Sequence, residues 1–176
     1  MATKDRLVTI GINSIKLQEL DSAGADVGTP IELGQTREDS FNLTKEDGTT
    51  VDIRVEETDD PIYLRTSKGT YSVTWNSPNC DPESLAKVTG GTWSESDGYS
   101  SPLKAVVKDY RVIVASEDGY DLTLNRVSIR ADFSGNLGRN NPLELVVNGN
   151  VLTPKDAIKG LYTLKKKVII KNIIKK

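Results

Sequence analysis

Short stretches in which apolar and polar residues alternate recur along most of the chain, and this pattern restricts the fold to one built mainly from β-strands. In "TTVDIRVEE", residues 49–57, apolar side chains alternate with charged ones, as in a strand buried on one face. The preceding Asp47-Gly48 is a strong turn signal, so a hairpin is predicted over 40–57. The stretch "PIYLRTSKGTYSVTWN" predicts a second hairpin that turns at 67–69.

A third hairpin is predicted by "YRVIVASEDGYDLTLNRVSIRADF", which turns at 117–119. After this turn the apolar residues lie at even positions up to Leu124 and at odd positions from Val127. Because successive side chains of a strand point to opposite faces, the change predicts a bulge near 125–126. Further strands are predicted in "RLVTIGINSIKLQEL" and "TPIELGQ", and a strand pair turning around 148–149 is predicted in "NPLELVVNGNVLTP".

One stretch departs from the strand pattern, namely "SPNCDPESLAKVTGGTW", residues 77–93. Asp81 is suited to cap the N-terminus of a helix, with Pro82 at its first position. The two glycines at 90–91 permit a left-handed end after about two turns. A helix this short is not stable alone, so we expect Leu85 and its apolar neighbours to pack it over the open end or flank of the sheet.

Together these elements predict a mainly β fold, an antiparallel β-sandwich or barrel with one short flanking helix and a long hairpin. A chain of 176 residues suffices for one core of ordinary size, so a single β-sandwich domain is predicted over 1–163. Residues 164–176 are predicted to form a basic C-terminal arm. Its six lysines leave −8 on residues 1–163, because the whole chain carries −2. These lysines are Lys165, Lys166, Lys167, Lys171, Lys175 and Lys176.

Residue usage excludes several kinds of chemistry. The chain has no histidine and one cysteine, Cys80, which excludes Ser-His-Asp and Cys-His catalysis and an internal disulfide. No Cys-x-x-Cys pair offers a zinc site, and glycine-rich phosphate-binding motifs are absent. We expect no enzymatic activity, no cofactor and no metal ion, and we expect Cys80 to be a small buried residue beside the helix cap.

An acidic run ends at Pro61 and consists of Glu56, Glu57, Asp59 and Asp60. Three interpretations are open. The carboxylates could hold Ca²⁺ or Mg²⁺, although the EF-hand spacing is missing. They could form the solvated end of a hairpin, or they could give this surface a negative field that repels a passing polyanion.

The basic ending "LKKKVIIKNIIKK" has two interpretations. As an amphipathic helix it would place Leu164, Val168, Ile169 and Ile173 along one side, against an anionic membrane. Its β-branched residues fit a strand as well, so it could be an arm that adds to a neighbouring subunit's sheet, with its lysines against that neighbour's acidic surface. No apolar run of signal-peptide or membrane-spanning length occurs, and we expect a protein kept in a soluble compartment.

The order of these features resembles that of the tail tube proteins of long-tailed bacteriophages. The resemblance rests on the hairpin at 40–57, the strands of 62–76, the helix in "DPESLAKVTGG" and the late strands "LTLNRVSIRADFSG" and "LELVVNGNVL". It implies a β-sandwich with one flanking helix, assembled as hexameric rings that stack into a hollow tube through which DNA passes during ejection. It also implies a loop or hairpin that reaches the next ring, and an acidic lumen that DNA does not bind.

For this chain, the resemblance implies assembly in the bacterial host cytoplasm and a place in the virion tail, with other copies and other tail proteins as partners and no membrane. The acidic run at 56–60 would then face the lumen or the next ring. The lysines of 164–176 would lie at an inter-ring or outer surface, since lysines in the lumen would retain DNA.

Two other classes of protein remain open. A carbohydrate- or protein-binding module could use "WSESDGYSSP", residues 93–102, as an exposed loop and platform, although only 6% of the residues are aromatic. A hydrolase with paired carboxylates would need two acidic side chains from separate strands in one cleft, and the sequence indicates no such pair. Within the structural class, a tail terminator, a connector or an injection-system tube subunit would fit the same pattern.

Overall fold

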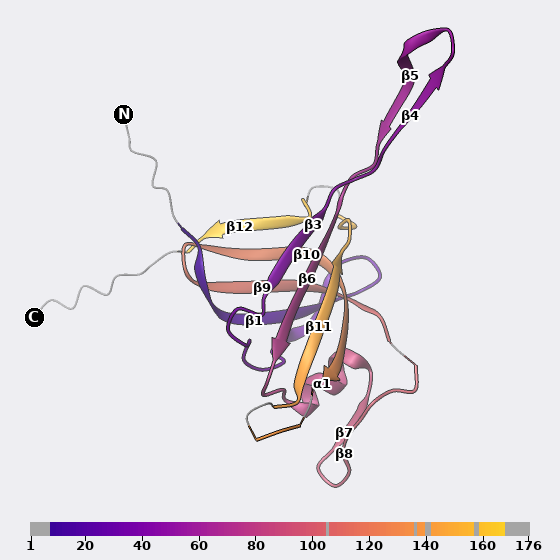
Figure 1. The fold of residues 1–176 in the computed structure, drawn as a ribbon. Helices are drawn as coiled ribbons and strands as arrows, with labels where there is room; N and C mark the ends of the chain where they lie inside the picture. Colours follow the sequence, from indigo (N-terminus) through magenta and orange to yellow (C-terminus); the bar gives the residue numbers. More distant parts are fainter. Residues whose placement is uncertain (1–7, 105, 136, 140–141, 157–158, 168–176) are drawn as a thin grey trace, which may run out of the picture.

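A computed structural model describes residues 8–104, 106–135, 137–139, 142–156 and 159–167. Within these ranges the chain forms twelve strands and one helix (Figure 1). The strands are β1 (Ile10–Leu20), β2 (Asp26–Ile31), β3 (Asn42–Glu46), β4 (Thr50–Val55), β5 (Thr58–Thr66), β6 (Thr70–Ser77), β7 (Thr92–Ser94), β8 (Gly98–Ser100), β9 (Lys108–Asp118), β10 (Tyr120–Ser134), β11 (Glu144–Val151) and β12 (Tyr162–Lys166). The helix is α1 (Pro82–Thr89).

Eight strands form one antiparallel sheet in the order β2-β1-β9-β10-β11-β6-β3, and β12 pairs with β10 beside this path. The long strand β10 changes its outer neighbour halfway: Leu122 is opposite Leu164 of β12, whereas Ile129 is opposite Gly149 of β11. The register against β9 shifts between Leu124 and Val127, so the bulge predicted from the apolar pattern is confirmed. The bulge keeps the apolar side of β10 on the core.

The sheet curls around one core, because side chains of β1 and β6, four places apart in the strand order, belong to the same buried cluster. Figure 1 shows β1, β9 and β12 crossing β3, β6 and β11 at a steep angle. The largest fully buried side chains include Tyr110 of β9 and Leu145 of β11. The predicted mainly β, antiparallel fold is confirmed, and the described strands form a large sheet without closing into a barrel.

The predicted helix is confirmed. Asp81 has an extended backbone, and its carboxylate accepts a hydrogen bond of 2.9 Å from the backbone N–H of Ser84. Gly90 ends α1 in the left-handed conformation, with φ of 76°. Leu85 and Val88 are buried in the core, and α1 lies at the end of the sheet away from β4 and β5 (Figure 1).

The two predicted hairpins at 40–57 and 61–76 are wrong in their pairing. β3 pairs with β6 and β4 pairs with β5, so residues 42–77 form a single long hairpin that turns at Glu56-Glu57. The predicted turns at 47–48 and 67–69 lie opposite each other, where the two strand pairs meet. They interrupt the two sides of one hairpin at the same level, and on each side the chain continues from one strand into the next without turning back.

A second turn prediction also fails. Residues 144–151 are one continuous strand, β11, with Gly149 between Ile129 of β10 and Val73 of β6. A Cβ at Gly149 would lie 2.6 Å from a Val127 methyl carbon, so this glycine gives room to neighbouring side chains and makes no turn. The hairpin that turns at Gly119 is confirmed, as is the first N-terminal strand, β1. The second strand lies earlier than the predicted stretch 29–35, because β2 runs from Asp26 to Ile31.

Candidate functional site

The most unusual surface is a projecting hairpin, residues 49–67, which we call the arm. It consists of β4 and β5, every residue of which is exposed. Figure 1 shows the arm leaving the body of the molecule, and neither strand pairs with any other strand in the described residues. Both outer edges of the arm therefore present backbone N–H and C=O groups that no described strand satisfies.

Both faces of the arm carry large apolar side chains in water. Ile53 lies opposite Tyr63 on one face, while Leu64 lies opposite Asp52 on the other. The exposed fraction is 50% for Ile53 and 63% for Leu64. The remaining exposed apolar residues of the arm are Val51, Val55 and Ile62. A soluble monomer rarely leaves such a run uncovered, so these residues are a candidate interaction surface.

The arm is joined to the body through a tight crossing of its two strands. The backbone N–H of Ser67 donates to the carbonyl of Thr49 (2.9 Å), and the N–H of Thr49 donates to the Ser67 hydroxyl (2.8 Å). Gly48 and Gly69 lie so close to the facing backbone that a Cβ on either would overlap a carbonyl oxygen. This crossing fixes where the arm leaves the body.

The predicted acidic run forms the tip of the arm. Glu56 and Glu57 make the turn, Asp59 and Asp60 follow at the start of β5, and all four are exposed. None of the four carboxylates pairs with a cation in the part of the chain that the structure describes. Arg54, the nearest cation along β4, is bound to Asp52 at 2.8 Å. The tip is a compact patch of four negative charges at the point farthest along the arm.

The basic C-terminal stretch predicted at 164–176 starts inside the main sheet. Residues 164–166 belong to β12, in which Lys165 is exposed opposite Asp121 and Lys166 is opposite Tyr120. The Lys167 ammonium donates to the carbonyl of Ser116 at 2.7 Å. Lys171, Lys175 and Lys176 lie outside the described residues. The structure therefore ties 164–167 to the sheet and does not bring them near the acidic tip (Figure 1).

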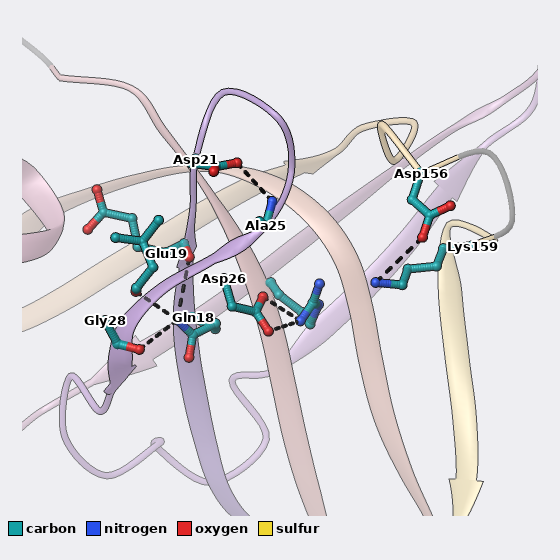
Figure 2. Close-up of polar contacts among 10 residues, drawn as sticks. Gln18, Glu19, Asp21, Ala25, Asp26, Gly28, Asp156 and Lys159 are labelled. Atoms are coloured by element: carbon teal, nitrogen blue, oxygen red, sulfur yellow. Dashed lines mark hydrogen bonds and ion pairs between the residues drawn. The ribbon is translucent and has the colours of Figure 1, made fainter.

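A polar cluster secures the β2 edge of the sheet (Figure 2). The buried Gln18 amide donates to the carbonyls of Val27 (2.8 Å) and Gly28 (3.3 Å), across a register shift between β1 and β2. Asp26 accepts from Arg111 at 2.6 Å. In the adjoining turn, backbone N–H groups of residues 25 and 23 hold the pKa of the Asp21 carboxyl below its usual value. These groups are paired with one another, so the cluster is structural.

One hollow has a volume of about 710 Å³ and lies between the start of β1, residues 36–41 and the turn of β9 into β10. Its lining mixes apolar side chains with the acidic Glu38 and Glu117. Its one arginine, Arg37, is bound to the buried carboxylate of Glu144. The chain has no histidine to activate a nucleophile here, and the Ser116 hydroxyl of the lining donates to the Asp121 carboxylate at 3.3 Å. We assign the hollow no reaction.

Residues 93–102, predicted as an exposed loop, form a small hairpin of β7 and β8. Tyr99 is turned inward: its hydroxyl bonds to Thr89 of α1 at 2.9 Å, and its ring meets Phe133 edge-on at 6.5 Å. Trp93 is 39% exposed, whereas Trp75 is buried in the core. One partly exposed indole is a narrow platform for a sugar, which typically stacks on open aromatic faces.

The described residues offer few groups suited to metal binding or covalent chemistry. The described residues contain no group of three or more Cys, Asp or Glu side chains placed to hold a metal ion. Cys80 is half-buried, and burial raises the pKa of its thiol to about 11, which makes it a poor nucleophile. We find no helix in the described ranges with the length and hydropathy needed to cross a lipid bilayer.

Comparison with known proteins gives no relative from which a role could be taken. No protein-family model matches the chain, and no curated protein sequence is significantly similar to it.

Proposed function

We propose that this chain is a structural subunit that self-assembles, with its arm as the contact between copies. The observation that carries the proposal is the arm itself, a two-stranded hairpin with apolar side chains on both faces and no partner in its own body. An isolated two-stranded hairpin is marginally stable in water at best. Contact with another copy would bury its apolar side chains and satisfy its free strand edges.

The assembly that we propose is a stack of rings forming a phage tail tube, a conduit for DNA ejection. The resemblance to tail tube proteins supports this form, because in that class a loop or hairpin reaches the next ring and six copies make each ring. The charge of −8 on residues 1–163 supports it physically, since DNA is repelled by an acidic wall and does not dwell there. The protein would act without a cofactor or catalysis, in the virion tail.

Negative-stain electron microscopy, with light scattering over a concentration series, tests the proposal. We expect rings or hollow tubes with six-fold end views. A matched variant would replace residues 47–69 by Asn-Gly, which closes Glu46 onto its partner Thr70 with a two-residue turn. This variant should keep the β signal of the wild type in circular dichroism and form no tubes. A wild-type protein that is monomeric at every concentration would overturn the proposal and favour the binding module.

A further inference from the structure

We propose that the arm of one copy binds the C-terminal segment of another copy, residues 168–176, through apolar packing along β4 and β5 and ion pairs at the acidic tip. The inference rests on the proposed function, since it names the partner that the arm engages in the assembly. It is carried by three properties of the chain: the open surface of the arm, the composition of the segment, and the limited reach of the segment.

The arm has two unmet requirements. Its apolar side chains need cover, because Ile62, Tyr63 and Leu64 are each more than half exposed. Its tip is open to cations, because four exposed carboxylates lie within residues 56–60 and none forms an ion pair with a described residue. A suitable partner must therefore be apolar and basic together, and it must be able to add a strand to an open edge.

The C-terminal segment has this combination of properties. Its sequence, "VIIKNIIKK", has five β-branched apolar residues, three lysines and no acidic residue. β-Branched residues favour strands and pack well on a half-exposed sheet. Three positive charges face four negative ones, so the charges of the segment and the tip are complementary.

The segment follows Lys167, which lies at the end of β12 remote from the arm of the same copy. β12 begins near the base of the arm, where the Tyr162 ring meets the Tyr71 ring at 5.8 Å. β12 then runs away from the arm (Figure 1), and the N–H of Lys167 donates to the carbonyl of Gly119 at the far end. Residues 168–176 therefore set out at a point remote from the arm of the same copy.

Chain length makes the same point. The nine residues of the segment span at most about 32 Å when fully extended. The arm tip lies eleven residue steps beyond Lys45, the strand partner of Tyr71, which is about 36 Å in strand geometry. The segment starts at the far end of β12, which runs away from the arm, so its distance to the tip is greater still. The segment cannot pair its lysines with its own tip, whereas the tip of a neighbouring copy is open to it.

Such a contact is heterologous, since each copy gives a segment and receives one on its arm. Contacts of this kind propagate from copy to copy and produce rings or filaments. A self-complementary two-fold contact would stop at a dimer. The proposed contact therefore has the symmetry that a stack of rings requires.

Charge reversal tests the contact. One variant reverses the tip (Glu56→Lys, Glu57→Lys, Asp59→Lys, Asp60→Lys), and another reverses the segment (Lys171→Glu, Lys175→Glu, Lys176→Glu). In each variant alone, tip and segment have the same sign, so the concentration needed for assembly should rise by about tenfold or more. In an equimolar mixture, an alternating arrangement of the two variants lets every tip meet a segment of opposite sign. Assembly should return to near the wild-type concentration, and high salt should weaken it.

Controls separate this contact from general charge effects. Glu95→Lys and Lys104→Glu change exposed charges away from the arm, and each should assemble as the wild type does. If the wild type assembles but the reversed variants also assemble unchanged, or their mixture fails to recover, the contact proposed here is wrong while the structural function stands. If the wild type forms no assembly under any condition, the proposed function itself fails.

Discussion

Gly48 lies directly against the carbonyl oxygen of Ser67, where the long hairpin passes from the body into the arm. A Cβ at this position would overlap that oxygen, so Gly48→Ala must push the two strands apart. We expect a loss of about 1 to 3 kcal/mol in the free energy of unfolding, measured by urea denaturation. Gly160→Ala is the control, because its Cβ would meet nothing closer than 3.6 Å. Equal stability of the two variants would contradict the crossing described here.

Gly149 occupies a place in the core for which no larger residue has room. A Cβ there would lie 2.6 Å from Val127 and 3.0 Å from Val73. We expect Gly149→Ala to reduce the free energy of unfolding by about 1 to 3 kcal/mol, by overpacking. Adding Val127→Ala should recover part of that loss, because it removes the clashing methyl groups. Denaturation of both single variants and the double variant gives the coupling energy, and additive losses would argue against the clash.

Leu85 holds α1 on the core, since its side chain is 1% exposed and lies in the main buried cluster. Leu85→Ala should cost about 2 to 5 kcal/mol, because it removes buried methyl groups and leaves a cavity. Lys87→Ala, on the exposed side of the same helix, is the matched control and should cost less than about 1 kcal/mol. Retention of wild-type stability by the Leu85 variant would show that α1 is not packed in this way.

The helix cap should make stability depend on pH. Hydrogen bonds from Ser84 hold the pKa of the Asp81 carboxyl below its usual value of 3.8. A lowered folded-state pKa means that the cap stabilises above the unfolded-state value and that this stabilisation is lost as the pH falls through the folded-state value. Asp81→Ala should cost about 1 kcal/mol at pH 7. The difference from wild type should shrink below about pH 4, and a constant difference would contradict the charged cap.

Cys80 should react slowly with thiol reagents in the folded protein. Burial raises the pKa of its thiol to about 11, from an ordinary value of 9.0. At pH 8 this reduces the thiolate population by about a hundredfold, and alkylation should slow in proportion. Labelling in urea, where the thiol is exposed, provides the reference rate. Equal rates in the folded and unfolded chains would show that the thiol is open to solvent.

The sequence allowed accurate prediction where the signal was local. Asp81, Pro82 and Gly90 each act on the backbone beside them, and the helix begins and ends as they indicate. The change of apolar positions around Asn125 also located the bulge, and the structure adds its reason. The Asn125 side chain donates to the carbonyl of Gly160 at 2.7 Å, where β10 exchanges β12 for β11.

Strand pairing was less predictable, because glycine serves two purposes that look alike in a sequence. At Gly119 it permits a positive φ of 96° in a true hairpin turn. At Gly48, Gly69 and Gly149 it makes room for a facing backbone or side chain, and the partner that needs this room is remote in sequence. The true turn of the long hairpin, Glu56-Glu57, has no glycine. One interpretation of the acidic run, the solvated end of a hairpin, agrees with the turn at Glu56-Glu57. That this hairpin projects from the body as an arm was not predicted.

The interruption at 47–48 and 67–69 separates β4 and β5 from the strands that pack on the core, so the length of the arm can change without altering the core. β3 and β6 pair below the interruption, as in Asn42 opposite Thr74, and every residue of β4 and β5 beyond it is exposed. Equal insertions or deletions in β4 and β5 would move the tip outward or inward by about 3.3 Å per residue pair. Steps of two residues would keep each side chain on its original face. Such changes would alter the reach of the arm and leave the residues that pack in the core unchanged.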